Sequence, residues 1–346
     1  MKLIPIIAAR FCALLCGAWL FAPSAVAVTF EGLYEAEVPV ESQAAELRPE
    51  ALQRALVTVL VRVTGRREVA ADPAVASLLD TTEQFVQQFG YTVDDTLRVV
   101  FDGTALRDAL LDAGQPVWGS ERPATLLWLA IDSGSGQRTL IGADSASDVT
   151  ELLESVATQR GIPLVLPLLD SEDLARVSFS DVWGGFDEAI LAASERYGAD
   201  AVLVGRAGRS VDGRLLVRWI LHFRDQREEW RSTLDDGIQH AADRFARVFA
   251  PAGDRLLRAV RIDVSGIDGL RAYGAVSQFL ESLTLVQSVG VEEVADDRVV
   301  FRVALRGEAE TLDRAISLGH ILEPVGADNP DQQTRAGADL NYRFRP

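Results

Sequence analysis

The stretch ADAVLVGRAGRSVDGRLLVRWILHF, residues 199–223, decides the fold class of this chain. Residues 201–204 are a short, continuous apolar run, which is typical of a parallel strand buried on both faces. After the turn signal Asp212-Gly213 the pattern changes, because alternate residues from Leu215 to Phe223 form an apolar row, and Arg218 and His222 lie on the opposite face. The stretch therefore predicts a parallel α/β sheet that carries an antiparallel hairpin at one edge.

The sequence on either side extends this sheet into a middle module, residues 121–252. Apolar runs at 125–131 and 162–169 predict two more buried strands, and the segment between 169 and 186 reads as a polar linker. Strands that alternate with helices are typical of a parallel sheet. The remaining expected elements are helices at 148–159, 186–196 and 238–249, and a second hairpin strand at 229–234.

Two flanking modules are predicted where turn-rich sequence at 119–123 and 251–254 separates the patterned blocks. The N-terminal module, residues 28–120, has the expected order β-α-α-β-α. Its elements are a strand at 29–40, helices at 49–64 and 73–89, a strand at 96–101 and a helix at 104–111.

The C-terminal module, residues 253–346, has the expected ferredoxin-like order β-α-β-β-α-β. Alternation of Leu340, Tyr342 and Phe344 with polar residues predicts one final edge strand. The fold class is thus α/β and α+β in three small modules.

Residues 1–27 resemble a secretory signal peptide. Lys2 and Arg10 flank the start, residues 11–21 are apolar, and Ala25-Val26-Ala27 is a cleavage pattern. An uncleaved anchor is disfavoured because Pro23 shortens the apolar run, and a lipoprotein at Cys16 is disfavoured by its flanking residues. We expect an exported, periplasmic protein, cleaved after Ala27, without a transmembrane segment in the mature chain.

Composition excludes several kinds of chemistry. Both cysteines, Cys12 and Cys16, lie in the expected signal, and no lysine follows Lys2. The mature chain therefore has no thiol, disulfide, Schiff-base lysine or phosphate-loop lysine. The formal charge of −17 becomes −19 when Lys2 and Arg10 are subtracted, which disfavours nucleic acid as a partner.

Motifs for catalysis or metal binding are also missing from the sequence. The three histidines have no zinc spacing, Gly134-Ser135-Gly136 lacks the rest of a dinucleotide fingerprint, and no G-x-S-x-G elbow occurs. We therefore expect no catalytic residues, cofactor or metal. A hydrolase site made of two carboxylates that are distant in the sequence stays an open alternative, because only the folded structure decides whether two of them face each other.

One segment is basic in this acidic chain, and arginine and tryptophan are favoured at recognition surfaces. The alternative is a solvated hairpin, balanced by nearby acids. The candidate partner surface consists of Arg206, Arg209, Arg214, Arg218, Trp219, Arg224 and Arg227, with Trp230 and Arg231 in the same segment.

A candidate small-molecule pocket lies at Trp183 and Phe186. These aromatics surround the turn Gly184-Gly185, beyond the C-terminal end of a predicted parallel strand, where open sheets tend to bind ligands. The alternative is a helix entrance at which Trp183 covers the core.

Several stretches together resemble a known family. They are Val38-Pro39-Val40, ALVTVLVRVTG at 55–65, Phe101-Asp102, Pro116-Val117-Trp118 and RPATLLWL at 122–129. They are similar to the proteobacterial domain-of-unknown-function family 2066, whose members are exported and have no assigned activity. The resemblance implies no catalytic residues.

These observations favour a non-catalytic periplasmic accessory or scaffold protein of the cell envelope, which acts through contacts with other envelope proteins. A small-ligand-binding periplasmic protein is the second hypothesis. A carboxylate-dependent hydrolase is the third.

Overall fold

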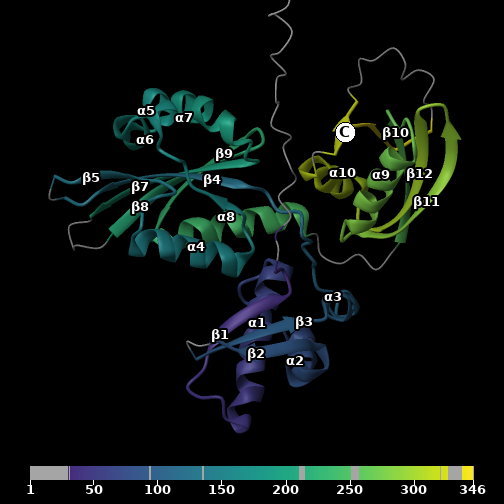
Figure 1. Cartoon of the computed structure of the whole chain (residues 1–346), viewed down its shortest axis with the longest axis horizontal. Helices are drawn as coiled ribbons and strands as arrows, with labels where there is room; N and C mark the ends of the chain where they lie inside the picture. Colours follow the sequence, from purple (N-terminus) through teal and green to yellow (C-terminus); the bar gives the residue numbers. More distant parts are fainter. Residues whose placement is uncertain are drawn as a thin grey trace, which may run out of the picture.

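The computed structural model describes residues 30, 32–92, 95–134, 136–209, 215–250, 257–319, 321–325 and 337–345. Within these residues the chain forms three sheets with separate helical layers, a mixed α/β architecture that confirms the predicted fold class (Figure 1). No helix in this part of the chain is long and apolar enough to cross a membrane.

The first sheet has the order β1-β3-β2, and all its strands are antiparallel. Helix α1 packs its apolar stripe against the sheet, with Leu56, Val59 and Val63 fully buried, and ends at Gly65 in a left-handed conformation. The elements are β1 (Glu35–Pro39), η1 (Ala45–Leu47), α1 (Arg48–Thr64), η2 (Val69–Ala71), α2 (Pro73–Asp80), η3 (Thr82–Phe85), β2 (Val86–Tyr91), β3 (Thr96–Phe101) and α3 (Gly103–Asp112).

The helix predicted over 73–89 is wrong in its second half. It ends at Asp80, and residues 86–91 instead form β2, which pairs with β3. β-branched and aromatic side chains such as Val86 and Tyr91 suit a strand, and pairing with β3 outweighs the helical spacing. The module order is therefore β-α-α-β-β-α rather than β-α-α-β-α.

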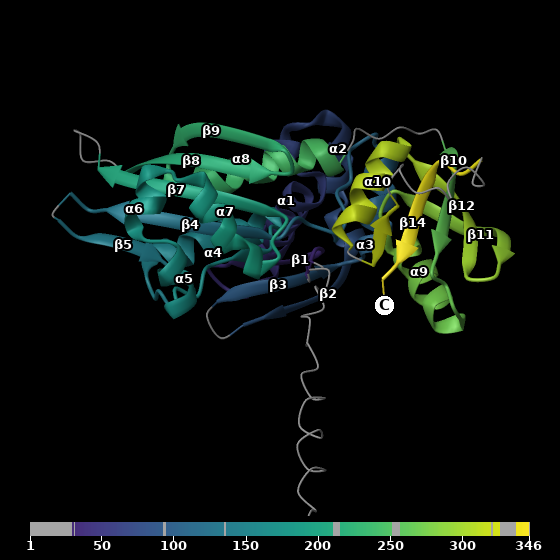
Figure 2. The ribbon, with the colours of Figure 1, turned by 90° about the horizontal axis from the view of Figure 1, so that it is seen from above.

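The middle sheet has the order β5-β4-β7-β8-β9, with β6 beside the start of β4. Helices α5, α6 and α7 cover one face, and α4 and α8 cover the other (Figures 1 and 2). The elements are β4 (Thr125–Asp132), β5 (Arg138–Ile141), α4 (Asp148–Arg160), β6 (Leu164–Val165), α5 (Ser171–Arg176), α6 (Phe179–Gly184), α7 (Asp187–Ser194), η4 (Glu195–Tyr197), β7 (Ala201–Arg209), β8 (Leu215–Phe223), β9 (Gln226–Ser232) and α8 (Leu234–Phe249).

The parallel core and its edge hairpin agree with the prediction. Strands β4 and β7 are parallel, whereas β7, β8 and β9 are antiparallel to one another. The strand predicted at 162–169 shrinks to β6, because Pro163 and Pro167 flank it and lack backbone donors. The predicted polar linker contains two short helices, α5 and α6.

The last sheet has the order β11-β12-β10-β14-β13. Its first three strands have the antiparallel pairing of a ferredoxin-like fold. The elements are β10 (Leu257–Ser265), α9 (Leu270–Ser282), β11 (Val286–Ala295), β12 (Arg298–Arg306), α10 (Ala309–Leu318), β13 (Leu322–Pro324) and β14 (Leu340–Phe344).

The prediction of a final edge strand is wrong, because β14 lies between β10 and β13. It runs parallel to β10 and antiparallel to β13, so β13 is the edge strand. Tyr342 at its centre is 1% exposed, and its hydroxyl hydrogen-bonds the Asp313 carboxylate on α10. Burial of this ring stabilises the inserted position.

Three arginines, Arg62, Arg122 and Arg160, are buried where the N-terminal module meets the middle one. Arg122 is 2% exposed, and its guanidinium stacks 3.7 Å from the Trp118 ring centroid. Arg160 donates to the Gly65 carbonyl at 2.9 Å and to the Asp243 carboxylate at 2.7 Å. The carbonyls at the end of α1 thus receive cationic donors, which also suit the negative end of the helix dipole.

Candidate functional site

Three arginines lie in direct register across the edge hairpin of the middle sheet. Arg206 on β7 pairs with Arg218 on β8, and Arg218 pairs with Arg231 on β9. Like charges directly opposite each other on neighbouring strands destabilise a sheet. The chain has 51 acidic residues, yet places none in this row, which we call the arginine row. The arrangement therefore calls for an explanation other than stability.

A hollow of about 430 Å³ lies over the arginine row. Its volume falls in the range of small-ligand pockets. Leu216, 47% exposed, gives the hollow an apolar surface, and Trp183 on α6 stands close to Gly208 of β7. We call it the arginine cleft, and its lining residues are Trp183, Arg206, Gly208, Arg209, Leu216, Val217, Arg218 and Arg231.

The approach of α6 to the sheet depends on glycine. Gly185 ends α6 with a φ of +70°, and a Cβ there would come within 3.1 Å of the Arg206 guanidinium. A side chain at this position would be strained and would push Arg206 away. Arg206 instead lies against the turn and donates from Nη1 to the Trp183 carbonyl at 3.3 Å.

The positive charge of the arginine row is poorly compensated. Among the described residues, its ion pairs are limited to a 3.7 Å contact between Arg218 Nε and Glu229, which also pairs with Arg227. Glu228 points to the opposite face, where it meets His240 and Arg244. Burial, followed by the charge of Arg218, lowers the pKa of the Arg206 guanidinium. The Arg206 Nε group is buried without a hydrogen-bond partner in the described part of the chain.

Trp183 is held by the local structure of α6. Ser178 and Asp181 form a capping box that fixes the start of this six-residue helix. The Phe179 and Trp183 rings stack at 5.5 Å, and Arg138 lies 5.7 Å over Phe179. Trp183 is 36% exposed, so it covers part of the core and also presents a face to the cleft.

The two sites predicted separately from the sequence therefore form one site in part. Trp183 joins Arg206, Arg209 and Arg218, and Arg231 completes the set. Phe186 is 59% exposed but does not line the cleft. Arg214 lies outside the described residues.

Three other residues of the predicted surface lie elsewhere. Trp219 is fully buried under α8, where its indole donates to the Thr233 carbonyl at 3.2 Å, so it cannot belong to a surface. It follows Arg218 in a strand and therefore points to the opposite face. Arg224 lies at the far end of the hairpin over Phe223, and Arg227 pairs with Asp187 at 2.8 Å.

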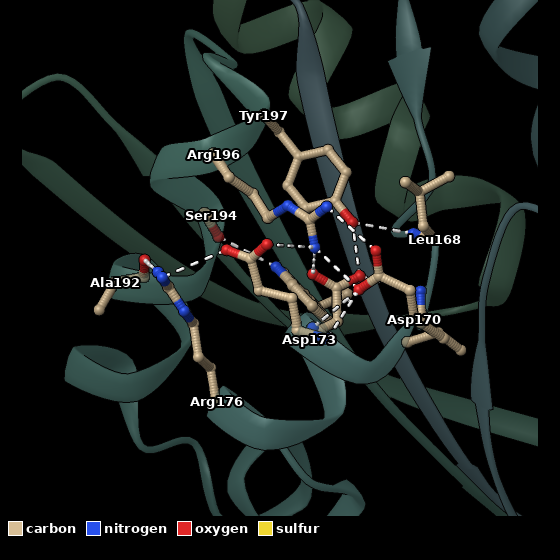
Figure 3. A network of polar contacts seen from close by, with 11 residues as sticks. Leu168, Asp170, Asp173, Arg176, Ala192, Ser194, Arg196 and Tyr197 are labelled. Atoms are coloured by element: carbon tan, nitrogen blue, oxygen red, sulfur yellow. Dashed lines mark hydrogen bonds and ion pairs between the residues drawn. The ribbon is translucent and has the colours of Figure 1, made fainter. Parts of the chain in front are cut away.

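A second polar cluster, on the same side of the sheet, centres on the fully buried Asp173 of α5. Figure 3 shows Arg196 and Tyr197 pointing toward this carboxylate. Arg196 Nη1 donates to Asp173 at 3.0 Å and to Asp170 at 2.8 Å, and the Tyr197 hydroxyl donates to Asp173 at 2.5 Å. The Leu168 amide donates to the Tyr197 oxygen at 2.8 Å.

Both Asp173 oxygens accept hydrogen bonds within the chain. Such a saturated carboxylate fastens α5 to η4, the short helix after α7, and leaves no proton acceptor for a substrate. The hydrogen bonds from Arg196 and the Asp173 amide hold the pKa of Asp170 down, at about 2.

Tyr197 in this cluster is expected to ionise late. Burial, followed by the hydrogen bond to Asp173, raises its pKa from the ordinary 10.0 to about 12. A raised pKa means that its stabilising effect is complete below pH 10 and is lost as the pH rises to about 12. Ultraviolet titration of wild type and Tyr197→Phe should therefore differ by one tyrosine that ionises near pH 12. A difference centred near pH 10 would contradict this account.

Across the described ranges, no group of three or more His, Cys, Asp and Glu side chains is placed to hold a metal ion. The candidate site therefore has charge, an aromatic wall and an apolar floor as its chemistry. It can bind an anion with arginine donors, and a flat or apolar group beside Trp183 and Leu216.

One comparison bears on the first sheet. A family model described as "Domain of unknown function (DUF8605)" matches residues 27–119. This confirms the coarser prediction of an uncharacterised domain family for that part of the chain, whereas the resemblance to family 2066 stays a prediction. No curated protein matches the chain significantly.

Proposed function

We propose that this chain is a non-catalytic accessory or scaffold protein of the cell envelope, and that it binds an acidic segment of a partner protein in the arginine cleft. The observation that carries the proposal is the arginine row, in which Arg206, Arg218 and Arg231 face one another directly across three strands. Arginine forms paired hydrogen bonds with carboxylates, so the row is suited to aspartate and glutamate side chains.

The surroundings of the row support a protein segment as the ligand. Trp183 and Leu216 are exposed beside the arginines, and aromatic residues with arginine are favoured at binding hot spots. A partner that neutralises the row would also remove the repulsion between its members. The partner would therefore bind at the part of the sheet that repulsion between the arginines destabilises most.

The place of action is part of the same proposal. The signal-like sequence at residues 1–27 and the resemblance to the exported family 2066 support a periplasmic protein. Its mature form would begin at Val28.

A small anionic ligand is the second candidate, because the cleft volume of about 430 Å³ suits one. The two candidates differ in what fills the cleft. A metabolite would occupy the hollow alone, whereas a protein segment would also cover the outer edge of the sheet.

Crosslinking in intact cells tests the proposal. A photoreactive residue at Leu216, inside the cleft, should capture a protein, and the captured stretch should be rich in Asp and Glu. The matched control places the same photoreactive residue at position 270, where Leu270 begins α9 and is 89% exposed. Identical adducts from both positions, or captured stretches without acidic residues, would overturn the proposal.

A further inference from the structure

We infer that the partner segment binds as an additional strand on the outer edge of β9, with an acidic side chain that continues the arginine row. This inference rests on the proposed function and names its binding mode. Addition of an extended segment to a free sheet edge is a common way to recognise peptides.

The register of the hairpin shows which backbone groups face outward. Phe223 pairs with Gln226 across a two-residue turn, so this closing pair is hydrogen-bonded. Hydrogen-bonded and non-bonded pairs alternate along an antiparallel ladder. The amide and carbonyl groups of Arg227, Glu229 and Arg231 therefore point away from β8.

These outward groups are available for pairing. Within the described chain no hydrogen bond occupies the backbone of Arg227, Glu229 or Arg231. Their side chains are exposed, and Figure 2 shows β9 as the outermost strand of the sheet. Unpaired backbone groups along an edge are a template for another strand.

The backbone of the β9 edge has no bulge, proline or shortening, so its charged side chains are its protection. Edge strands are commonly blunted by all four devices. The edge strand β11 has two register shifts, β2 has one, β1 contains Pro39, and β5 and β13 are only four and three residues long. Strand β9 pairs with β8 over seven residues without a shift.

The inner face of β9 is firmly held. Trp230 stacks on His240 of α8 at 4.2 Å, and Glu228 contacts the same histidine at 2.8 Å. The strand is thus fixed by side chains that point away from the cleft. Its outer edge can accept a partner without rearrangement.

Charge and register define the occupant. A residue placed opposite Arg231 on an added strand would extend the row Arg206, Arg218, Arg231, so an acidic side chain is favoured there. Its sequence neighbours would point to the other face, beside the half-buried Trp230, where apolar side chains fit. The expected ligand therefore has an acidic residue opposite Arg231, with apolar residues on either side of it in the sequence.

The test uses one synthetic probe, the capped peptide VEVEVEV, here called the acidic peptide. It is titrated into full-length wild type, Glu229→Pro and Glu229→Ala. Both variants lose the same carboxylate, but only proline removes the outward amide, and it leaves the β8–β9 bonds intact. We expect at least tenfold weaker binding by Glu229→Pro than by Glu229→Ala, at similar unfolding temperatures.

Hydrogen exchange on wild type gives a second measurement that needs no variant. The acidic peptide should slow exchange at the amides of Arg227, Glu229 and Arg231. Equal binding by the two variants with unchanged exchange would overturn strand addition and leave the proposed function standing. If the acidic peptide does not bind wild type, both the proposed function and strand addition are overturned. If wild type forms a dimer that Glu229→Pro abolishes, the edge of β9 binds a second copy of the chain, and the inference is overturned.

Discussion

Replacing Arg122 with alanine is expected to lower the free energy of unfolding by about 3–5 kcal/mol, because three carbonyl acceptors lose their donor at about 1–3 kcal/mol each and a cavity forms. Arg122 is 2% exposed and donates to the carbonyls of Gly119, Trp118 and Arg62 at 2.5, 2.9 and 3.0 Å. Removal of the side chain leaves these acceptors without their donor and opens a cavity beside the Trp118 ring.

The charge of Arg122 has an unusual environment. Burial, followed by repulsion from Arg62, lowers the pKa of its guanidinium. Its closest partners are three carbonyl oxygens, one of them that of Arg62 at the end of α1, rather than a buried carboxylate. The planar, five-donor group can satisfy several carbonyls at once, which a lysine ammonium cannot do in the same geometry.

Chemical denaturation followed by tryptophan fluorescence measures the effect. Arg122→Lys should recover less than half of the lost stability. The matched control is Arg107→Ala, because the only ion pair of Arg107 among the described residues is a 3.4 Å contact with the exposed Asp108, and its loss should change stability by less than about 0.5 kcal/mol. A loss below 1 kcal/mol in Arg122→Ala would show that the buried arginines do not join the two sheets.

Reversing the charges of Arg206 and Arg218 together is expected to weaken binding of the acidic peptide about 100-fold, or about 2.7 kcal/mol. Each glutamate removes a donor for a carboxylate and adds repulsion against it. The double variant Arg206→Glu/Arg218→Glu should keep its fold, because positions 206 and 218 stay like-charged as in wild type, and the glutamate at position 218 attracts Arg231 instead of repelling it.

A control separates the site from the overall charge. Arg54→Glu/Arg302→Glu has the same change in net charge at exposed positions on α1 and β12, outside the middle sheet. It should weaken binding less than threefold, since neither side chain lines the cleft and exposed charges are screened at physiological salt. Equal losses in both double variants would show that binding follows net charge rather than the cleft.

The sequence predicted the fold best where periodicity was long and undisturbed. The strand at 215–223 and the helix at 148–159 agree with β8 and α4 within one residue. The errors lie where pairing partners decide the structure. Strand β2 forms because β3 is beside it, and β14 enters the sheet because Tyr342 finds Asp313 on α10. Neither partner can be read from local sequence.

The site was predicted only in part, and the reason is also geometric. Basic composition pointed to the hairpin, but strand alternation already places Trp219 opposite Arg218, and that signal could have removed it from the surface. The capping box at Ser178 and Asp181 could have revealed α6. Trp183 lies beside the arginine row because of the way α6 crosses the sheet, and no spacing in the sequence shows this crossing.

The most direct test of the central claim is a charge swap in the arginine cleft. Wild type and Arg206→Glu/Arg218→Glu are each titrated with the acidic peptide and with its lysine counterpart, VKVKVKV. Wild type should prefer the acidic peptide, and the double variant should prefer the basic one. The same ranking of the two peptides by both proteins would contradict recognition through the arginine row.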